Sequence, residues 1–185
     1  YGFFRGVALN QLELEHGNIV SAFEYQTYDG PWTDVSEDVR KKNANIRYVT
    51  PLADGELSIT AMAYDNSWNG ADQIPERAVE TGLIDRLGSL DTQVGGTSSR
   101  YSLSANYKSE AFNASLYAID SDLSLFSNFT YFLDDPTRGD QFEQTDQRNI
   151  FGGEVFTVLP LPITPGSSVT IGSQFQYDDI GNVGL

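Results

Sequence analysis

The stretch Tyr101-Ser-Leu-Ser-Ala-Asn-Tyr-Lys108 decides the fold, because apolar and polar residues alternate strictly along it. Successive side chains of a β-strand point to opposite faces, so this segment has one apolar and one polar face. The same two-residue period recurs along most of the chain. It predicts an all-β, antiparallel protein of about eight strands. In the strand from Tyr101 to Lys108 the apolar positions are Tyr101, Leu103, Ala105 and Tyr107.

Short and long connections alternate between the predicted strands. This spacing is typical of up-and-down barrels of the outer membrane, which have tight turns at one end and large loops at the other. Within one long loop, Pro75 and Gly82 bracket a predicted short helix. We expect short periplasmic turns near 15–18, 51–55, 109–112 and 160–166, and long extracellular loops at 29–42, 65–99, 133–147 and 178–185.

One predicted strand, from Asn113 to about Phe132, has roughly 20 residues, whereas a typical soluble strand has about 5 or 6. This length favours a barrel whose strands project beyond the bilayer. We expect its odd positions, from Tyr117 through Leu123 to Tyr131, to face lipid. Its even positions, including Asp120, Asp122 and Ser124, would then face a wet lumen. Aromatic girdles at the bilayer interfaces are expected from residues near the strand ends: Tyr28, Tyr48, Tyr64, Tyr107, Tyr131 and Phe132.

Composition excludes several classes of function. The 185 residues include 26 acidic and 11 basic side chains, for a net charge of −15, which argues against nucleic-acid binding. The sequence has no cysteine, which excludes disulfides, thiolate metal sites and cysteine nucleophiles. No run approaches the roughly 18 apolar residues of a membrane helix.

The two-residue period also fits a soluble or secreted β-sandwich with acidic, possibly cation-binding loops, and this alternative stays open. Eight strands could close into a small barrel, but the loops are too large for a minimal one. An open sheet in lipid would leave unpaired edges, which lipid does not tolerate. Because Tyr1 to Phe4 already read as part of a strand, we expect about eight strands of a larger barrel.

Two stretches resemble a known family. The first is Asp72-Gln-Ile-Pro-Glu-Arg-Ala-Val-Glu-Thr-Gly-Leu-Ile84, followed by Arg86-Leu-Gly-Ser-Leu-Asp91. The second is Leu125-Phe-Ser-Asn-Phe-Thr-Tyr-Phe-Leu-Asp-Asp135, followed by Gly139-Asp-Gln-Phe-Glu-Gln144 and Arg148. Both resemble loops and strands in the first third of the barrel of bacterial TonB-dependent outer-membrane receptors.

The resemblance implies a 22-stranded barrel in the outer membrane of a Gram-negative bacterium, surrounded by outer-membrane lipid and closed by an N-terminal plug. It implies import of a scarce small ligand, such as a ferric siderophore, another metal chelate, cobalamin or a sugar. The inner-membrane TonB complex would drive this import. The sequence contains no plug, TonB box or C-terminal strand of that family, so we expect no transport by this segment alone. We expect neither enzymatic activity nor a cofactor.

No catalytic constellation stands out from the sequence. His16 is the only histidine and lies in a predicted turn, which disfavours a Ser-His-Asp triad or a histidine metal site. Asp134, Asp135, Asp140 and Glu143 could hold a hard cation such as calcium, but they lack EF-hand spacing, and a solvated loop is favoured. The residues that we expect along a ligand path are Glu24, Arg47, Trp32, Trp68, Asp120 and Asp122.

Overall fold

The computed structural model describes residues 1–129, 133–136, 139–163 and 166–185. In these residues the chain is all-β, with eight strands in one antiparallel sheet and a single short helix, α1 (Glu76–Glu80). The strands are β1 (Phe4–Leu14), β2 (Gly17–Tyr28), β3 (Val39–Leu52), β4 (Gly55–Asn69), β5 (Gly95–Lys108), β6 (Phe112–Ser127), β7 (Phe142–Pro160) and β8 (Ser168–Gly184).

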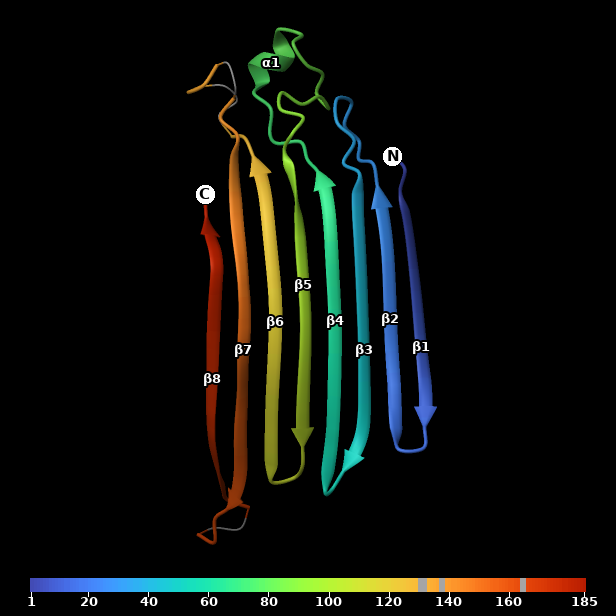
Figure 1. Ribbon diagram of the computed structural model, residues 1–185, viewed down its shortest axis with the longest axis vertical. Helices are drawn as coiled ribbons and strands as arrows, with labels where there is room; N and C mark the ends of the chain where they lie inside the picture. Colours follow the sequence, from blue (N-terminus) through green and yellow to red (C-terminus); the bar gives the residue numbers. More distant parts are fainter. Residues whose placement is uncertain (130–132, 137–138, 164–165) are drawn as a thin grey trace.

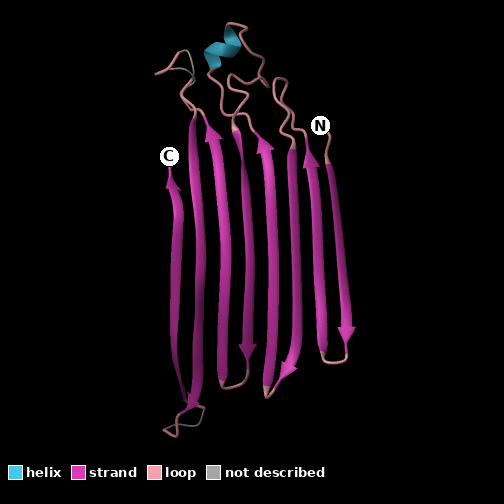
Figure 2. Cartoon of the chain, viewed as in Figure 1, coloured by secondary structure: helices cyan, strands magenta, loops and turns pink. Residues whose placement is uncertain are grey.

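The topology is up-and-down, and each strand pairs with the next one along the chain (Figure 1). The strands form one layer, with β1 and β8 at its two edges (Figure 2). Among the described residues β1 and β8 do not pair, so the sheet is open and not closed into a barrel. A single layer leaves both of its faces without a covering element.

Short turns lie at one end of the sheet and long loops at the other, as Figure 1 shows. The β1–β2 turn is formed by Glu15 and His16 alone, and the β3–β4 turn by Ala53 and Asp54, with Ala53 at a positive φ of 54°. The three long loops that join β2–β3, β4–β5 and β6–β7 gather at the opposite end, where α1 also lies. The predicted alternation of short and long connections is thus present, as is the short predicted helix.

Most strands extend further towards the loop end than the sequence pattern predicted. The largest difference concerns residues 178–185, which we expected to form a loop. β8 instead continues to Gly184 and pairs with β7 beyond a register shift at Gln147 and Arg148. Asp178, Asp179 and Gly181 favour turns by local preference, but pairing with the long β7 overrides that preference. The prediction of a loop from Asp178 onwards was therefore wrong.

Register assigns every strand residue to one of two faces, because directly paired residues point to the same side. We call the side that carries Phe23, Ala44, Ala63 and Tyr101 the apolar face; these residues pair in one row across β2 to β5. The opposite side is the polar face. Its central row contains Glu24, Asn43, Tyr64, Arg100, Ser121 and Arg148.

The register overturns the predicted faces of β6. Asp120 pairs with Tyr101, and Asp122 pairs with Ser99, so both aspartates lie on the apolar face. Leu123 pairs with Ser98 on the polar face, whereas Ser124 lies on the apolar face. The expected apolar side of this strand was wrong because its half near the turn end carries apolar residues on the even positions, from Phe112 to Ala118.

The predicted aromatic girdle is divided between the two faces. Tyr48 and Tyr107 lie on the apolar face near the turn end of the sheet, but Tyr28 and Tyr64 lie on the polar face. Tyr131 and Phe132 fall outside the described residues.

Close packing of aromatic rings over glycines fixes part of the sheet. Tyr117 and Gly152 are directly paired on the polar face. A Cβ atom at Gly152 would lie 2.3 Å from the ring of Tyr117, so a side chain at this position would force the ring to move. On the other face, the space above Gly153 is occupied by Leu116 and Phe175.

Buried apolar side chains are few, and they lie at the loop end rather than within the sheet. Among the described residues the buried hydrophobic residues are Val35, Ala78 and Val94. Large apolar residues of the sheet itself remain exposed, such as Phe175 at 60 %. The helix of the described residues is too short and too polar to cross a membrane. The sheet therefore needs a covering of its apolar face that this layer does not supply.

Candidate functional site

The polar face contains a hollow of about 500 Å³ over β1 to β5. Its floor is formed by small or neutral side chains, and charged residues stand around them. The register places all of these side chains on the polar face: Ala22, Asn45, Met62 and Ser102 in the floor, and Arg5, Glu24, Asn43, Tyr64 and Arg100 around it. Its size lies in the range of about 300–1,000 Å³ that is usual for small-ligand sites.

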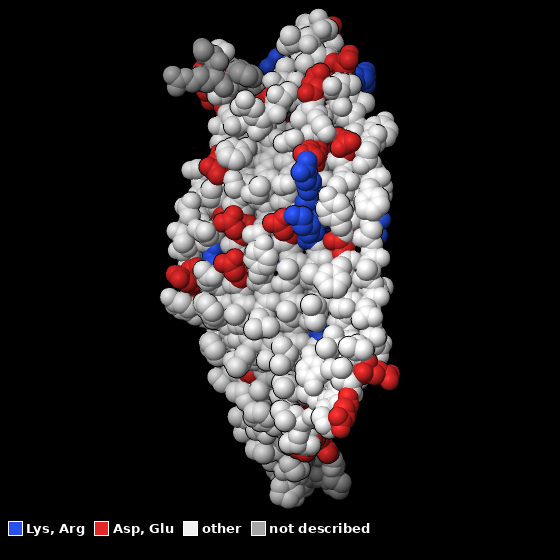
Figure 3. Space-filling model, turned by 45° about the vertical axis from the view of Figure 1, so that its right-hand side comes forward, with Lys and Arg blue, Asp and Glu red and all other residues white. Residues whose placement is uncertain are grey.

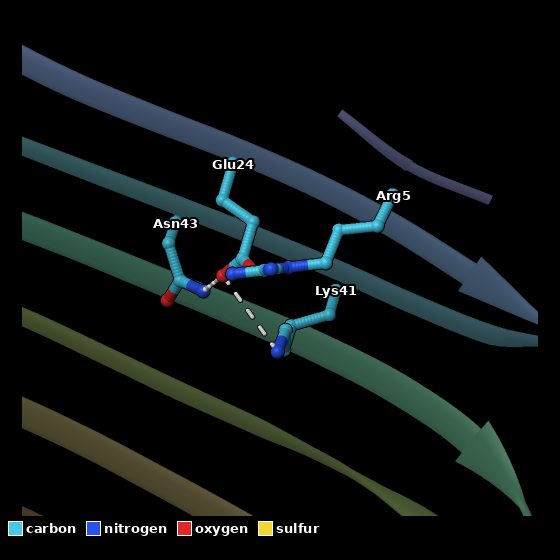
Figure 4. A network of polar contacts seen from close by, with 4 residues as sticks. All are labelled: Arg5, Glu24, Lys41 and Asn43. Carbon is cyan, nitrogen blue, oxygen red and sulfur yellow. Dashed lines mark hydrogen bonds and ion pairs between the residues drawn. The ribbon is translucent and has the colours of Figure 1, made fainter. Parts of the chain in front are cut away.

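Glu24 is the centre of a polar network beside this hollow (Figure 4). Arg5 Nε donates to Glu24 Oε1 at 2.5 Å, and Asn43 Nδ2 donates to Oε2 at 2.5 Å. Lys41 Nζ lies 3.6 Å from Oε2. The Glu24 side chain is only 16 % exposed, which fits a carboxylate held by two cations and an amide. The network carries a net positive charge, since two basic groups face one acid.

A third basic group, Arg100, lies in the row of the sheet that contains Glu24. Arg100 pairs with Tyr64 and is exposed, and no ion pair of Arg100 occurs among the described residues. Arg148 lies further along that row and forms a double hydrogen bond with Asp146. Next to Lys41 in the register, Asn66 has a buried Oδ1 atom without a hydrogen-bond donor among the described residues. Of these residues only Arg100 lines the hollow, where its guanidinium leaves donors available.

The arrangement suits a small molecule that carries both anionic groups and an apolar or aromatic part. Arg100 and Arg5 can bind carboxylate or phosphate oxygens, and Arg binds such groups in a planar, two-pronged geometry. Tyr64 offers a ring face and a hydroxyl, and Met62 offers an adaptable apolar surface. No group of three or more His, Cys, Asp or Glu residues that could hold a metal ion occurs within the described ranges.

The loops next to β4 and β6 are tied together by acidic side chains. Asn128 is completely buried; its backbone N–H donates to Asp72 Oδ2 at 2.8 Å, and its Nδ2 donates to Asp91 Oδ2 at 2.9 Å. Asp34, from the β2–β3 loop, accepts from the backbone N–H of Ser89 at 3.0 Å. Three loops that are distant in sequence are thus joined into one cap at the loop end.

The structure brings together only some of the residues predicted for a ligand path. Glu24 and Arg47 both lie on the polar face, but Arg47 pairs with Val20, four residues away along β2 and therefore about 13 Å from the Glu24 network. Arg47 is exposed and does not line the hollow. Asp120 and Asp122 lie on the opposite face, as described above, so the expectation that they share a wet face with Glu24 was wrong.

The two tryptophans are near the loop end. Trp32 Nε1 donates to Glu37 Oε1 at 2.5 Å, so its indole is held by its own loop. Trp68 lies on the polar face at the end of β4, beside Gly96. Neither residue lines the hollow.

The acidic cluster considered for a cation has another role. Asp140 accepts hydrogen bonds from the backbone N–H groups of Leu133, Asp134 and Asp135, at 2.8, 3.1 and 2.7 Å. A carboxylate that caps successive backbone amides closes a turn, which is a common role of aspartate in loops.

The sequence pattern did not single out Arg5, Asn43 or Arg100. Arg100 carries a signal in the sequence, because it has the same parity as the polar residues Ser102 and Ser104, whereas the strand that contains Arg5 does not alternate. Their proximity depends on register between strands about 20 to 95 residues apart, which alternation alone does not give. Comparisons with protein-family models, curated proteins and solved structures found no match to this chain.

Proposed function

We propose that these eight strands form part of the wall of a larger outer-membrane β-barrel, in a receptor that imports a small ligand such as a ferric siderophore or another metal chelate. The observation that carries this proposal is an uncharged band on the apolar face, which crosses all eight strands at an angle. The receptor class rests on the resemblance of the loop sequences to TonB-dependent receptors.

The band has the height of a bilayer's apolar layer. On four strands its uncharged positions span nine residues, or eight residue steps: Gly17 to Tyr25, Ala44 to Leu52, Phe151 to Leu159 and Val169 to Tyr177. Eight steps of about 3.4 Å give about 27 Å along a strand. Within these limits every apolar-face position of the described strands is uncharged. Charge begins directly above the band at Lys42, Asp65, Asp120 and Asp179.

The upper edge of the band slopes across the sheet. On β1 the edge lies at Phe4, two register rows above the row that contains Ala44, Ala63 and Tyr101. On β6, β7 and β8 the edge lies one row below that row, at Ala118, Phe151 and Tyr177. The edge thus falls by three rows of two residues each, which is about 20 Å along the strands. It does so across seven strand intervals of about 4.8 Å, which is about 34 Å across the sheet. If the edge follows the membrane plane, the strands tilt by about 30°, near the 35–45° of membrane barrels. The tilt reduces the band to a height of about 23 Å.

Aromatic residues occur at both edges of the band, where membrane barrels place their girdles. Tyr25, Tyr101 and Tyr177 lie at the upper edge, and Tyr107 lies towards the lower one, whereas Tyr48 lies in the middle of the band. Figure 3 shows the corresponding distribution of charge, with acidic and basic side chains gathered towards the loop end above a mostly uncharged region. The polar face, with its hollow, would then line the interior of the barrel.

A soluble β-sandwich binding module remains the second candidate. It accounts for the alternation, but a sandwich requires a second sheet about 10 Å away across its core. All eight strands of the described residues belong to one sheet. A sandwich also does not explain why charged side chains begin along one sloping edge of the uncharged band on the same face.

The test of the proposed function has two parts. The native protein is first extracted from outer membranes, and we expect it to need detergent and to show heat-modifiable mobility on a gel. A deletion strain is then supplied, under iron limitation, with a panel of radiolabelled ferric chelates and cobalamin. We expect the strain to lose uptake of one of them, and expression of the intact gene to restore it.

Each part has an outcome that would contradict the proposal. A detergent-independent protein would overturn the membrane placement and favour the sandwich. A membrane-bound protein whose deletion changes uptake of no compound in the panel would contradict the receptor class alone. A variant with Arg100→Gln serves as the site test, because the change removes a charge of the hollow without altering the uncharged band.

A further inference from the structure

The polar face has a second hollow, separate from the one that contains Arg5 and Arg100. It measures about 450 Å³ and lies over β6, β7 and β8, which are neighbours at one edge of the sheet (Figure 1). Its residue Glu154 is six positions further along β7 than Arg148, which lies in the row of Arg100. The second hollow is therefore about 20 Å nearer the turn end of the sheet. We call it the β6–β8 hollow.

A row of three polar side chains without partners crosses the β6–β8 hollow. Ser115, Glu154 and Gln174 are directly paired in register, one on each strand, so their Cα atoms follow one another at about 5 Å. Glu154 and Gln174 are exposed and Ser115 is half-buried. None of the three has a side-chain hydrogen bond or ion pair among the described residues. Their hydrogen-bonding groups are therefore free to bind a ligand.

Tyr117 forms one side of the hollow. It pairs with Gly152, which pairs with Gln176, and Tyr117 Oη donates to Gln176 Oε1 at 3.1 Å. The Tyr117 side chain therefore crosses over Gly152 from β6 towards β8 and lies along the sheet. Gln176 Nε2 in turn donates to Asp178 Oδ1 at 3.1 Å, which holds the amide in the orientation that accepts from Tyr117. The ring is half-buried, so an apolar surface lies beside the polar row.

We propose that the β6–β8 hollow binds a neutral saccharide, with its hydroxyls on the polar row and its C–H face on the ring of Tyr117. A carboxylate only accepts hydrogen bonds, whereas a primary amide and a serine hydroxyl both donate and accept. Hydroxyl groups satisfy all three, because each hydroxyl donates one hydrogen bond and accepts others. The volume also fits the usual range of about 300–1,000 Å³ for small-ligand sites. This site depends on the register and not on the membrane placement, and it is additional to the site of the proposed function.

Charge separates a saccharide from other small ligands. Glu154 is the only charged side chain that lines the hollow within the described residues, and its carboxylate repels an anion. A protonated amine would satisfy Glu154, but it has no acceptor for the amide donors of Gln174. A simple polyol would satisfy the polar row but has no rigid apolar face for Tyr117. A saccharide meets both requirements.

The test measures binding of maltose, lactose and sucrose to the full-length protein, purified in a detergent without a sugar head group. Saturation-transfer NMR, with saturation of the aromatic protons, shows which C–H protons of the disaccharide lie against a ring. We expect at least one of the three to bind in the millimolar range and its ring C–H protons to receive saturation. Citrate should not displace it, because the β6–β8 hollow carries a carboxylate and no cation.

Matched variants locate the site. Gln174→Leu removes the donors and the acceptor of one member of the row and should weaken saccharide binding about tenfold. Gln11→Leu makes the same change on the polar face of β1 and should leave binding unchanged. Glu154→Gln keeps an acceptor and should retain most of the saccharide binding, whereas it would abolish binding of an amine.

The saccharide site is excluded if none of the three disaccharides binds, which is also the result expected if another segment of the chain fills the hollow. It is excluded too if Gln174→Leu and Gln11→Leu weaken binding equally, or if spermidine displaces the bound disaccharide. None of these results bears on detergent dependence or on uptake of chelates, so each leaves the proposed function standing. A detergent-independent protein would instead overturn the membrane placement, and the same saccharide titrations would still test the hollow.

Discussion

A single arginine placed on either face of β5 tests the membrane placement directly. Ala105 and Ser104 are adjacent small residues, and the register places Ala105 on the apolar face and Ser104 on the polar face. Ala105 lies four residues below Tyr101, about 14 Å along the strand. With a tilt of about 30°, that distance corresponds to a depth of about 12 Å, the middle of a band of about 23 Å.

The expected cost follows from that depth. An arginine on the lipid face of a membrane barrel costs about 2–4 kcal/mol at the bilayer midplane. Ala105→Arg should therefore lower the ratio of folded to unfolded protein by roughly 30-fold to 900-fold. Ser104→Arg points to the wet side, and we expect a change within about 0.5 kcal/mol, as for other surface substitutions.

The assay is a urea titration of the protein folded into lipid vesicles, with the folded fraction read from its heat-modifiable mobility on a gel. Ala105→Leu provides the control for bulk. Facing lipid it should be nearly neutral, whereas in the packed core of a sandwich the added methylenes would cost about 1–3 kcal/mol. The membrane placement is refuted if Ser104→Arg costs as much as Ala105→Arg, or if Ala105→Leu is strongly destabilising.

Three further substitutions test the loop cap, the sheet and the polar network. Asn128→Ala removes the buried side-chain hydrogen bond to Asp91 that joins two loops, and it should lower the free energy of unfolding by about 1–3 kcal/mol. Faster hydrogen exchange in the β4–β5 loop would show the loss, and unchanged exchange would contradict the role of this side chain. Gly152→Val should lower the melting temperature because its Cβ meets the ring of Tyr117 at 2.3 Å; Tyr117→Ala in the same chain should restore part of the loss, and no recovery would exclude the ring as the cause. Glu24→Gln leaves two cations without their carboxylate and should strengthen citrate binding in calorimetry. Glu154→Gln, which removes a carboxylate from the polar face of β7 away from the network, should not; equal effects would argue against a local network.

Alternation predicted the strands and their order because it depends on neighbouring residues alone. In the stretch from Tyr101 to Lys108, each apolar position lies on the apolar face, as the register shows. The turns could also be predicted from neighbouring residues. Asp54 lies in the β3–β4 turn and Gly17 directly follows the β1–β2 turn, and both residue types favour turns. Strand ends were harder to predict. Asp178 and Asp179 pair with β7 although both residue types favour turns.

The candidate site depended on information that alternation does not contain. The carboxylate of Glu24 meets Arg5 and Asn43 only because three strands pair in one register. The loop cap is a stronger case, because Asn128 reaches Asp72 and Asp91 across 56 and 37 residues of sequence. Asparagine and aspartate are common in loops as backbone caps, so their residue types gave no sign of this long-range connection.

The error at β6 shows why face and depth must be assigned together. Alternation predicts Asp120 on the polar side because it shares even positions with Asp122 and Ser124, and this prediction assumes that a face keeps one character along a whole strand. The register instead places Asp120 on the apolar face, one residue pair beyond the last apolar position, Ala118. Lys42, Asp65 and Asp179 stand at the same transition on three other strands. The apolar surface of a packed protein core has no reason to end at a common sloping line, but a surface that faces a bilayer of fixed thickness does. Asp120, whose face was wrongly predicted, is therefore also part of the best support for the membrane placement.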